Sequence, residues 1–235
     1  MNKASVSVII PSFNSTSTIE RAVKSIANQS LLPKEVIIVD DCSTDERMEK
    51  VLRRIKTKYS DYFDFKILLN QSNKGPGVSR NAGWKVSNGE FIAFLDSDDS
   101  WHKQKIEIQY NYMINNPGVD FTCHKNLEVL EGQFESSEEI LDDQQFNIES
   151  IKFKQLLYRN RIGTRTVMLK RSIENRFRQG KYHSEDYLLW LEVAASNYKI
   201  QILDVPLSKS YSHPFLGDGL SGSIIKMFKG AIDTY

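Results

Sequence analysis

Cysteine, long apolar runs and net charge are all scarce in this chain, and each shortage excludes a class of protein. Its 2 cysteines, Cys42 and Cys123, are too few for a disulfide framework or a cysteine-based zinc site, and they suit a reducing compartment. No stretch approaches the roughly 18 to 20 apolar residues that cross a bilayer, and the apolar run near the N-terminus is too short for a signal peptide. A net charge of +1 gives no case for nucleic-acid binding. We therefore expect a cytosolic protein with no nucleic-acid partner.

The glycine-rich loops that bind nucleotides in many α/β proteins are missing as well. The turn after the first predicted strand, PSFNSTST, contains no glycine, so the G-x-G-x-x-G phosphate loop of dinucleotide-binding enzymes is excluded. The segment NKGPG at residues 73–77 lacks the spacing of a P-loop and the Lys-Ser or Lys-Thr pair that ends one. Nucleotide binding here would depend on acidic residues and a metal ion.

Apolar strands and amphipathic helices alternate through the first 100 residues. Strands are predicted at residues 5–10, 35–39, 65–69 and 91–95, and helices with apolar stripes at residues 19–27, 48–59 and 78–86. Ser17 and Glu20 fit a capping box for the first helix, and Asp45 is placed to cap the second. Alternation of this kind with short connections predicts an α/β fold with a parallel sheet covered by helices on both faces.

The second half is less regular. Helices are expected at residues 103–115, 151–158 and 184–195, strands at 119–123, 127–130, 166–170 and 200–203, and a mobile loop within the acidic segment after residue 130. The charges form blocks, acidic from 126 to 151 and basic from 152 to 181. These blocks are either solvated faces or, for the basic block, a surface that attracts a phosphorylated or membrane-bound substrate.

Polar residues follow three of the predicted strands at the end where ligands collect in parallel sheets. Pro11 to Asn14 follow the first strand, Asp40 and Asp41 end the second, and Asp96-Ser97-Asp98-Asp99 ends the fourth. Three carboxylates within four residues are costly near a core strand because like charges resist burial, and Mg²⁺ or Mn²⁺ would remove that cost. The alternative is a solvated acidic turn that caps the next helix.

Five segments together resemble the family 2 glycosyltransferases. SVIIPSFN, VIIVDDCSTD, NKGPGVSRNAG, GEFIAFLDSDDSW and SEDYLLWL occur here in the order and spacing of that family, over about residues 4–213. The resemblance implies a GT-A-type, Rossmann-like α/β fold with a mostly parallel sheet, helices on both faces and an elaborated C-terminal acceptor-side region. It also implies a single domain over 1–235, with a nucleotide-sugar-binding half at about 1–100, an acceptor-binding half at about 101–213 and a tail at 214–235.

The resemblance also implies roles on the donor side. Asp40 and Asp41 match the motif in which a carboxylate accepts a hydrogen bond from the uracil N–H, although Asp41 could instead cap a helix. Lys74 and Arg80 match positions near the pyrophosphate or the donor sugar, or else are surface charges. The full set of predicted nucleotide-sugar contacts is Pro11, Phe13, Asn14, Asp40, Asp41, Lys74, Arg80, Asp96 and Ser97.

Asp96 and Asp98 match the D-x-D motif of the family. By this resemblance Asp98 is the direct ligand of Mn²⁺ or Mg²⁺, Asp96 holds the ribose or a metal-bound water, and Asp99 supports the sugar or the metal shell. His213 resembles a histidine that completes the metal shell in some members. Its alternative is a loop histidine bonded to backbone.

Glu185 and Asp186 match the acidic pair of the family. Asp186 would be the general base that takes the acceptor hydroxyl proton, and Glu185 would bind or orient the acceptor. Trp101 and Trp190 are assigned to the acceptor and sugar side, with a core position as the alternative for Trp190. The basic segment 160–166 precedes the pair, and the motif match gives no single residue in it a role.

The predicted function is therefore inverting transfer from a UDP-sugar to a glycan hydroxyl, with a lipid-linked polysaccharide or O-antigen precursor as the acceptor class. The alternatives are a sugar-nucleotide pyrophosphorylase and a non-catalytic sugar-nucleotide or glycan-binding module. The tail at residues 223–235 mixes apolar residues with two lysines. This pattern is typical of a peripheral helix at the inner face of the membrane. The alternatives are a packed C-terminal helix and a homodimer contact.

Overall fold

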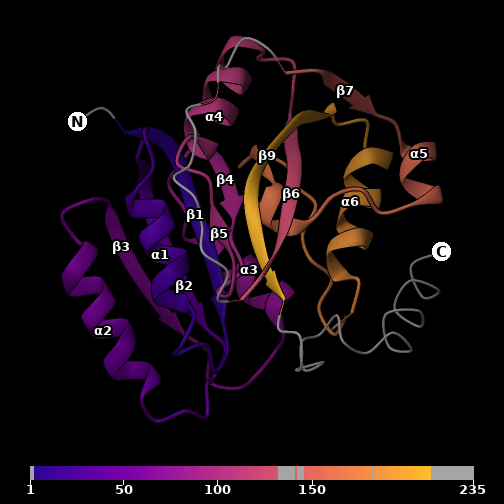
Figure 1. The fold of residues 1–235 in the computed structure, drawn as a ribbon. Coiled ribbons are helices and arrows are strands. Elements are labelled where there is room, and N and C mark those ends of the chain that lie inside the picture. The colour runs from indigo at the N-terminus through magenta and orange to yellow at the C-terminus, as the bar shows by residue number, and fades with distance from the viewer. Residues whose placement is uncertain (1–2, 132–140, 142–145, 182, 213–235) are drawn as a thin grey trace.

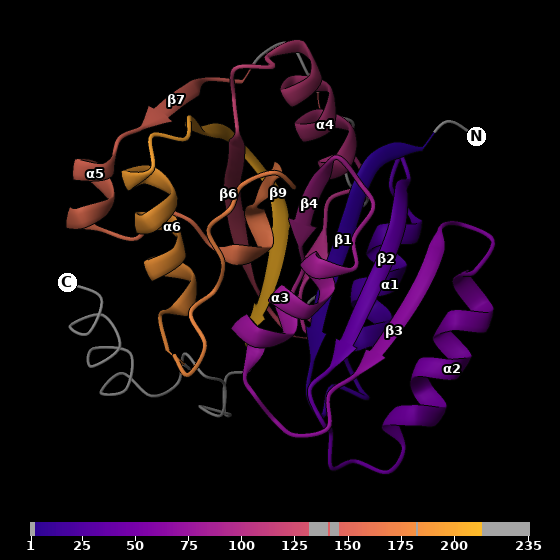
Figure 2. The ribbon, with the colours of Figure 1, turned by 180° about the vertical axis from the view of Figure 1, so that it is seen from behind.

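The computed structural model describes residues 3–131, 141, 146–181 and 183–212, which build one mixed sheet with helices on both faces (Figures 1 and 2). Along the described sheet the strand order is β3-β2-β1-β4-β8-β6-β9-β5, and β7 pairs with β9. The strands are β1 Ala4–Ser12, β2 Pro33–Asp40, β3 Asp64–Leu69, β4 Phe91–Phe94, β5 Ser100–Trp101, β6 Phe121–Leu130, β7 Ile148–Ile151, β8 Met168–Lys170 and β9 Ile200–Ser212. The helices are α1 Ile19–Ala27, α2 Met48–Tyr59, α3 Pro76–Lys85, α4 Lys105–Asn115, α5 Phe153–Tyr158, α6 Glu185–Ala195 and the 3-10 turn η1 Thr164–Thr166.

The first four strands form the parallel half that the sequence predicts. β2 lies between β1 and β3, and β4 flanks β1 on its other edge, all parallel. The side chains of β1, β2 and β4 are buried on both faces because α1, α2 and α4 pack on one side and α3 and α6 on the other, whereas the edge strand β3 is partly exposed. Figures 1 and 2, which view the molecule from opposite sides, show α2 and α3 on these two faces. The carboxyl ends of β1, β2 and β4 are thereby brought to one edge.

The second half of the sheet mixes directions. β8 is antiparallel to both β4 and β6, whereas β9 is parallel to β6 and antiparallel to β5 and β7. The sequence predicts two short strands at 119–123 and 127–130, and the structure joins them in the single strand β6, whose register shifts around Lys125. β9 is far longer than the predicted 200–203, because it continues along β6 to Ser212.

The two predicted helix caps have different outcomes. The capping box of Ser17 and Glu20 is wrong: α1 begins at Ile19, and the Ser15 carbonyl already accepts the N–H groups of Thr18 and Ile19. Glu20 instead pairs with two basic side chains of α2, Arg54 and Lys58. Asp45 does stabilise the turn that opens α2, because its carboxylate accepts the Arg47 N–H at 3.0 Å.

Most of the mobile loop predicted after residue 130 lies outside the described residues, as do His213 and the tail at 223–235. Among the helices of the described ranges, none combines the length and the apolar character that a membrane span requires.

Candidate active site

The ends of β1, β2 and β4 meet as the sequence predicts. Ser12 is in register with Asp40, and the Asp41 N–H donates to the Ser12 carbonyl at 2.8 Å. On the other side of β1, the Leu95 N–H donates to the Ile9 carbonyl at 3.1 Å. The turns after β1 and β2 each contain a left-handed residue other than glycine, Asn14 with φ 51° and Cys42 with φ 61°. Such backbone is costly and collects at functional sites, which supports this edge as the site.

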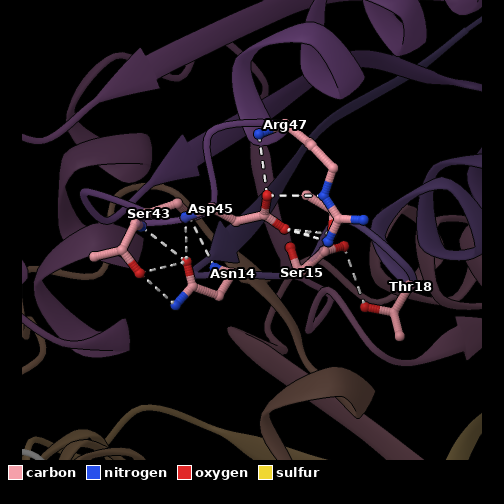
Figure 3. A network of polar contacts seen from close by, with 8 residues as sticks. Asn14, Ser15, Thr18, Ser43, Asp45 and Arg47 are labelled. Carbon is pink, nitrogen blue, oxygen red and sulfur yellow. Dashed lines mark hydrogen bonds and ion pairs between the residues drawn. The ribbon is translucent and has the colours of Figure 1, made fainter.

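Asn14 fastens the turn after β1 to the turn after β2 (Figure 3). Its Oδ1 accepts the backbone N–H groups of Thr44 and Asp45 at 2.8 and 3.1 Å, and its own N–H donates to Ser43 Oγ at 2.8 Å. Figure 3 also shows the neighbouring pair Asp45 and Arg47. Asn14 therefore shapes the predicted nucleotide-binding edge through loop contacts.

Asp40 and Asp41 are buried and hydrogen-bonded within the chain. Asp40 accepts from the hydroxyl and the N–H of Ser43. Asp41 accepts from the Lys74 and Gly75 N–H groups at 3.1 and 2.7 Å, and thereby holds the NKGPG loop against β2. Gly75 has φ 85°, a backbone conformation that favours glycine at this position. Asp41 is thus a loop anchor in the structure and not the helix cap considered above.

The two other residues predicted beside the base differ in exposure. The Phe13 ring is 46% exposed beyond the end of β1, whereas Pro11 is buried in that strand. The Lys74 side chain is exposed. An exposed aromatic ring and an exposed cation thus flank the buried carboxylates of Asp40 and Asp41.

Arg80 on α3 joins the donor-side and acceptor-side acids. Its Nη2 donates to Asp96 Oδ1 at 2.6 Å and its Nη1 donates to Glu185 Oε1 at 2.9 Å. Only 5% of Arg80 is exposed, so it is not a surface charge. The helix comes close to α6 at Gly77, where an added Cβ would lie 3.1 Å from Glu185 Cγ. Burial alone would raise the pKa of Asp96, but Arg80 and Arg165 lower it below its usual value.

Asp98 and Asp99 differ in their surroundings within the acidic turn. Asp98 is exposed and Asp99 is buried, whereas Ser97, which precedes Asp98, is half-buried. Reduced hydration and then the neighbouring Asp96 raise the pKa of Asp98. Burial raises the pKa of Asp99, and Asp96 and Asp98 add to this, although Arg165 opposes it. The surroundings of Asp98 and Asp99 therefore disfavour the negative charge of both side chains.

These surroundings bear on the predicted metal ion, which would stabilise negative charge at the turn. In the described part of the chain, no group of three or more His, Cys, Asp and Glu side chains is arranged to hold a metal. The side chains present do fit a hard cation, because Asp96 and Asp98 offer only oxygen and their mutual repulsion would be relieved. His213, the third predicted ligand, lies outside the described residues.

Sequence reasoning missed Thr164 and Arg165, which lie in η1 between the two acidic groups. Arg165 Nε pairs with Asp99, and Arg165 Nη2 lies 4.0 Å from Asp96 Oδ2. Thr164 Oγ1 donates to Asp186 Oδ2 at 3.0 Å. The segment NRIGTRT carries no family motif that singles out either residue, and its basic character was the one available signal.

Arg21 on α1 was missed as well. It donates to the Asp98 carbonyl at 2.6 Å, pairs with Glu131 and stacks over the Tyr211 ring at 3.6 Å. Tyr211 in turn bonds Ser100 at 2.9 Å, so the end of β9 is fastened to the acidic turn.

Glu185 and Asp186 open α6 after Ser184, which has φ 54°. Burial raises the pKa of Asp186, and the opposing influences are Arg80, the Tyr187 N–H and Thr164. Burial also raises the pKa of Glu185, against the effect of Arg80. A carboxylate with a raised pKa is a better proton acceptor, which suits a general base.

The two tryptophans assigned to the acceptor side are buried. Trp190 is 0% exposed and packs edge-on against Phe121 and Phe177, so the core alternative is the correct one. Its indole has no free face for an acceptor. Trp101 is 3% exposed and donates from Nε1 to the Arg165 carbonyl at 2.8 Å. Its contact with the site runs through that carbonyl, because the ring itself lies within the core.

The amino-acid sequence is similar to that of known glycosyltransferases. Residues 7–177 match the family model described as "Glycosyl transferase family 2". The chain is 34% identical over 192 residues to the Escherichia coli UDP-Glc:alpha-D-GlcNAc-diphosphoundecaprenol beta-1,3-glucosyltransferase WfgD, covering 82% of this chain and 70% of that protein. It is 32% identical over 204 residues to the putative teichuronic acid biosynthesis glycosyltransferase TuaG of Bacillus subtilis, covering 83% and 74%.

Two solved structures show the same fold. TarS 1-349 of S. aureus in complex with UDP-GlcNAc superposes with a TM-score of 0.72 at 25% identity, covering 96% of this chain and 64% of that one. The mannosyltransferase PcManGT of Pyrobaculum calidifontis, in complex with GDP-Man and Mn²⁺, gives 0.64 at 15% identity, covering 90% and 57%, and supports the fold alone. This chain thus spans less than two thirds of either solved chain. Because the family match covers most of this chain, the chain belongs to the family 2 glycosyltransferases, has their GT-A fold and is a glycosyltransferase.

Proposed function

We propose that this enzyme transfers a sugar from a UDP-sugar to a hydroxyl of a glycan, with inversion at the anomeric carbon. The observation that carries the proposal is the position of Arg80, whose guanidinium contacts Asp96 of the D-x-D motif and Glu185 of the acidic pair. One buried side chain thus spans the distance between the donor-side acids and the acceptor-side acids. A donor held at Asp96 would place its anomeric carbon near Asp186.

The donor assignment rests on the turns after β1 and β2. The exposed Phe13 ring is placed to pack on a base, and Asp40 and Asp41 are acceptors for a base that offers an N–H. Each carboxylate oxygen has two lone pairs, so these acids can accept a further hydrogen bond. The names of two similar proteins point the same way, since WfgD is described with UDP-Glc and TarS was solved with UDP-GlcNAc. Lys74 and Arg80 would lie near the pyrophosphate.

We also propose that Mn²⁺ or Mg²⁺ is held by Asp98 with Asp96, and that His213 is a further ligand. When bound, such an ion would stabilise the negative charge of the departing nucleoside diphosphate. PcManGT, which shares the fold, was solved with Mn²⁺. Asp99 would keep Arg165 in place beside this shell, since the two side chains form an ion pair.

Asp186 is the proposed general base. The acceptor hydroxyl oxygen would bond to the anomeric carbon as the bond from that carbon to the phosphate oxygen breaks, and the hydroxyl proton would go to Asp186. The Thr164 hydroxyl donates to Oδ2 of Asp186, which leaves the other lone pairs of the carboxylate for the incoming proton. Glu185, tied to Arg80, would set the position of the acceptor.

The acceptor class is taken from the relatives. WfgD is described as acting on a GlcNAc-diphosphoundecaprenol, and we propose a lipid-linked glycan precursor for this chain, reached at the inner face of the membrane. The basic residues at 152–181 would favour an acceptor that carries phosphate. Within this scheme residues 1–100 bind the donor, residues 101–213 bind the acceptor, and the tail makes a membrane or homodimer contact.

The donor and metal proposals are tested by measuring UDP release from a panel of UDP-sugars, with Mn²⁺ and with EDTA. We expect slow hydrolysis of one donor that EDTA abolishes and that Asp98→Ala lowers by at least about 100-fold, because the charge on the leaving group is then uncompensated. Glu49→Ala, an exposed carboxylate on α2, is the matched control. If no UDP-sugar is hydrolysed or bound in the presence of metal, the uridine assignment is wrong.

A further inference from the structure

Three consecutive carbonyls in and after η1 are each held by a buried side chain from another part of the fold. The Trp101 Nε1–H donates to the carbonyl of Arg165 at 2.8 Å, as noted above. The Gln109 amide donates to the carbonyl of Thr166 at 3.1 Å, and the Lys105 ammonium donates to the carbonyl of Val167 at 3.3 Å. The three donors are 3%, 0% and 0% exposed.

The donors share a simple sequence relationship, because Trp101, Lys105 and Gln109 are spaced four residues apart. Lys105 and Gln109 stand one turn apart on α4, and the Lys105 ammonium lies 3.9 Å from the centroid of the Trp101 ring. Gln109 also donates to the carbonyl and hydroxyl of Thr122 on β6. We call this group the Trp101–Lys105–Gln109 clamp.

The clamp holds the backbone of η1 from the core side, and two side chains of η1, Thr164 and Arg165, contact the acidic residues of the site. Thr164 donates to the proposed base Asp186, and Arg165 pairs with Asp99 next to the proposed metal ligands. These two residues therefore join the acceptor side to the donor side by a second path, separate from Arg80. A small shift of η1 would move both contacts together.

Lys105 is the member least explained by packing. Among the residues that the structure describes, no carboxylate lies within ion-pair distance of its ammonium, and burial lowers the pKa of Lys105 well below its usual value. A buried amine without a counter-ion costs stability, and an apolar side chain of similar length would fill the same space. A role in positioning η1 accounts for its presence.

We propose that Trp101, Lys105 and Gln109 are positioning residues that keep Thr164 and Arg165 in register with Asp186 and the D-x-D turn. The proposal deepens the proposed function and rests on it for the kinetic part alone. Its structural part, the clamping of η1, is independent of the reaction.

The test compares Lys105→Met with Lys56→Met, an exposed lysine on α2. We expect Lys105→Met to melt at or above the temperature of the wild type. The Thr166 and Val167 amides, which close η1 onto the carbonyls of Gly163 and Thr164, should exchange with solvent about tenfold faster. The kcat for transfer should fall at least about tenfold, while the Kd for UDP stays within about twofold. The control should match the wild type in every measurement.

A second variant, Trp101→Phe, keeps an aromatic ring beside Lys105 and removes the N–H that Arg165 accepts. It should produce the same faster exchange and lower kcat. Wild-type exchange at Thr166 and Val167, or a wild-type kcat, in both variants would overturn the proposal, as would a parallel loss of melting temperature and UDP binding. If the wild type transfers no sugar from any donor, the proposed function fails, and the exchange measurement still decides whether the clamp exists.

Discussion

Arg80 Nη1 lies 2.9 Å from Glu185 Oε1, so a residue of α3 is fixed to the first residue of α6 across the site. The same guanidinium bonds Asp96 at 2.6 Å through Nη2. A planar group with several donors can serve both carboxylates at once, whereas an ammonium concentrates its charge at one point. This geometry makes Arg80 a sensitive position for both stability and activity.

Replacing Arg80 by methionine should leave two crowded acids without their shared cation, which costs about 3–5 kcal/mol when one partner of a buried pair is removed. Arg80→Lys should fold but lose about 100-fold in kcat/KM, since a misplaced contact of about 1 Å has that effect. Urea denaturation and transfer kinetics measure the two effects, with Arg53→Lys, an exposed side chain on α2, as the control. Wild-type kinetics in Arg80→Lys would contradict the bridging role.

Thr164 is predicted to control the pH dependence of transfer. Burial raises the pKa of Asp186, and the charge of Asp96 adds to this rise. Arg80, the Tyr187 N–H and the Thr164 hydroxyl oppose it. The adjacent acid is Glu185. Thr164→Val removes one donor to the carboxylate, so the pKa of Asp186 should rise further. The base must be deprotonated to act, and the acidic limb of the kcat/KM profile should therefore move to higher pH by about 0.5–1 unit. Thr164→Ser should keep the wild-type profile because serine retains the hydroxyl. If the acidic limb of the kcat/KM profile does not move in Thr164→Val, the hydrogen bond between Thr164 and Asp186 has no role in transfer.

Glu35 provides a prediction for stability away from the site. The side chain is 1% exposed on β2 and accepts from Ser7, Lys66 and the Asn88 N–H. Burial would raise the pKa of Glu35, but these three donors outweigh it and lower the pKa below the usual value. A carboxyl whose pKa is lower in the folded state contributes stability above its unfolded pKa, and that stability is lost as the pH falls through the folded pKa.

Glu35→Gln should therefore reduce the free energy of unfolding by about 2–3 kcal/mol at pH 7, because its amide cannot accept all of these bonds. The difference from the wild type should shrink as the pH falls below about 4. Urea melts at pH 7 and pH 3.5 measure it, with the exposed Glu49→Gln as the control. A difference that stays constant with pH would show that the charge of Glu35 does not matter.

The parallel half of the sheet was predictable because each strand is an apolar run between helices with clear periodicity. β1 to β4 were placed to within a few residues on that signal. β5 has two residues and is defined by its pairing with β9, so the local sequence pattern does not predict it. The capping box of Ser17 and Glu20 failed because backbone contacts of Ser15 already satisfy the start of α1.

The candidate site was predictable where it follows strand ends and not where it depends on the fold of the second half. Asp40 ends β2, and Asp41, Asp96 and Asp98 follow the ends of β2 and β4 in a recognisable pattern. Arg165 reaches the acidic turn because β8 pairs antiparallel with β4, a relationship that residues 160–166 do not encode locally. Trp190 is an apolar residue in an apolar helix, and its packing against Phe121 and Phe177 assigns it to the core.

The proposed role of Asp186 is to remove the acceptor proton in a transfer from a UDP-sugar. Its most direct test is the single-turnover rate of transfer to a lipid-linked glycan acceptor by the wild type and by Asp186→Asn, with the Kd for UDP measured in parallel. Asparagine keeps the shape of the side chain and removes its basicity, so the rate should fall by about 10²–10⁴-fold while UDP binding stays within about twofold. A variant that transfers sugar within tenfold of the wild-type rate would contradict the assignment of Asp186 as the base.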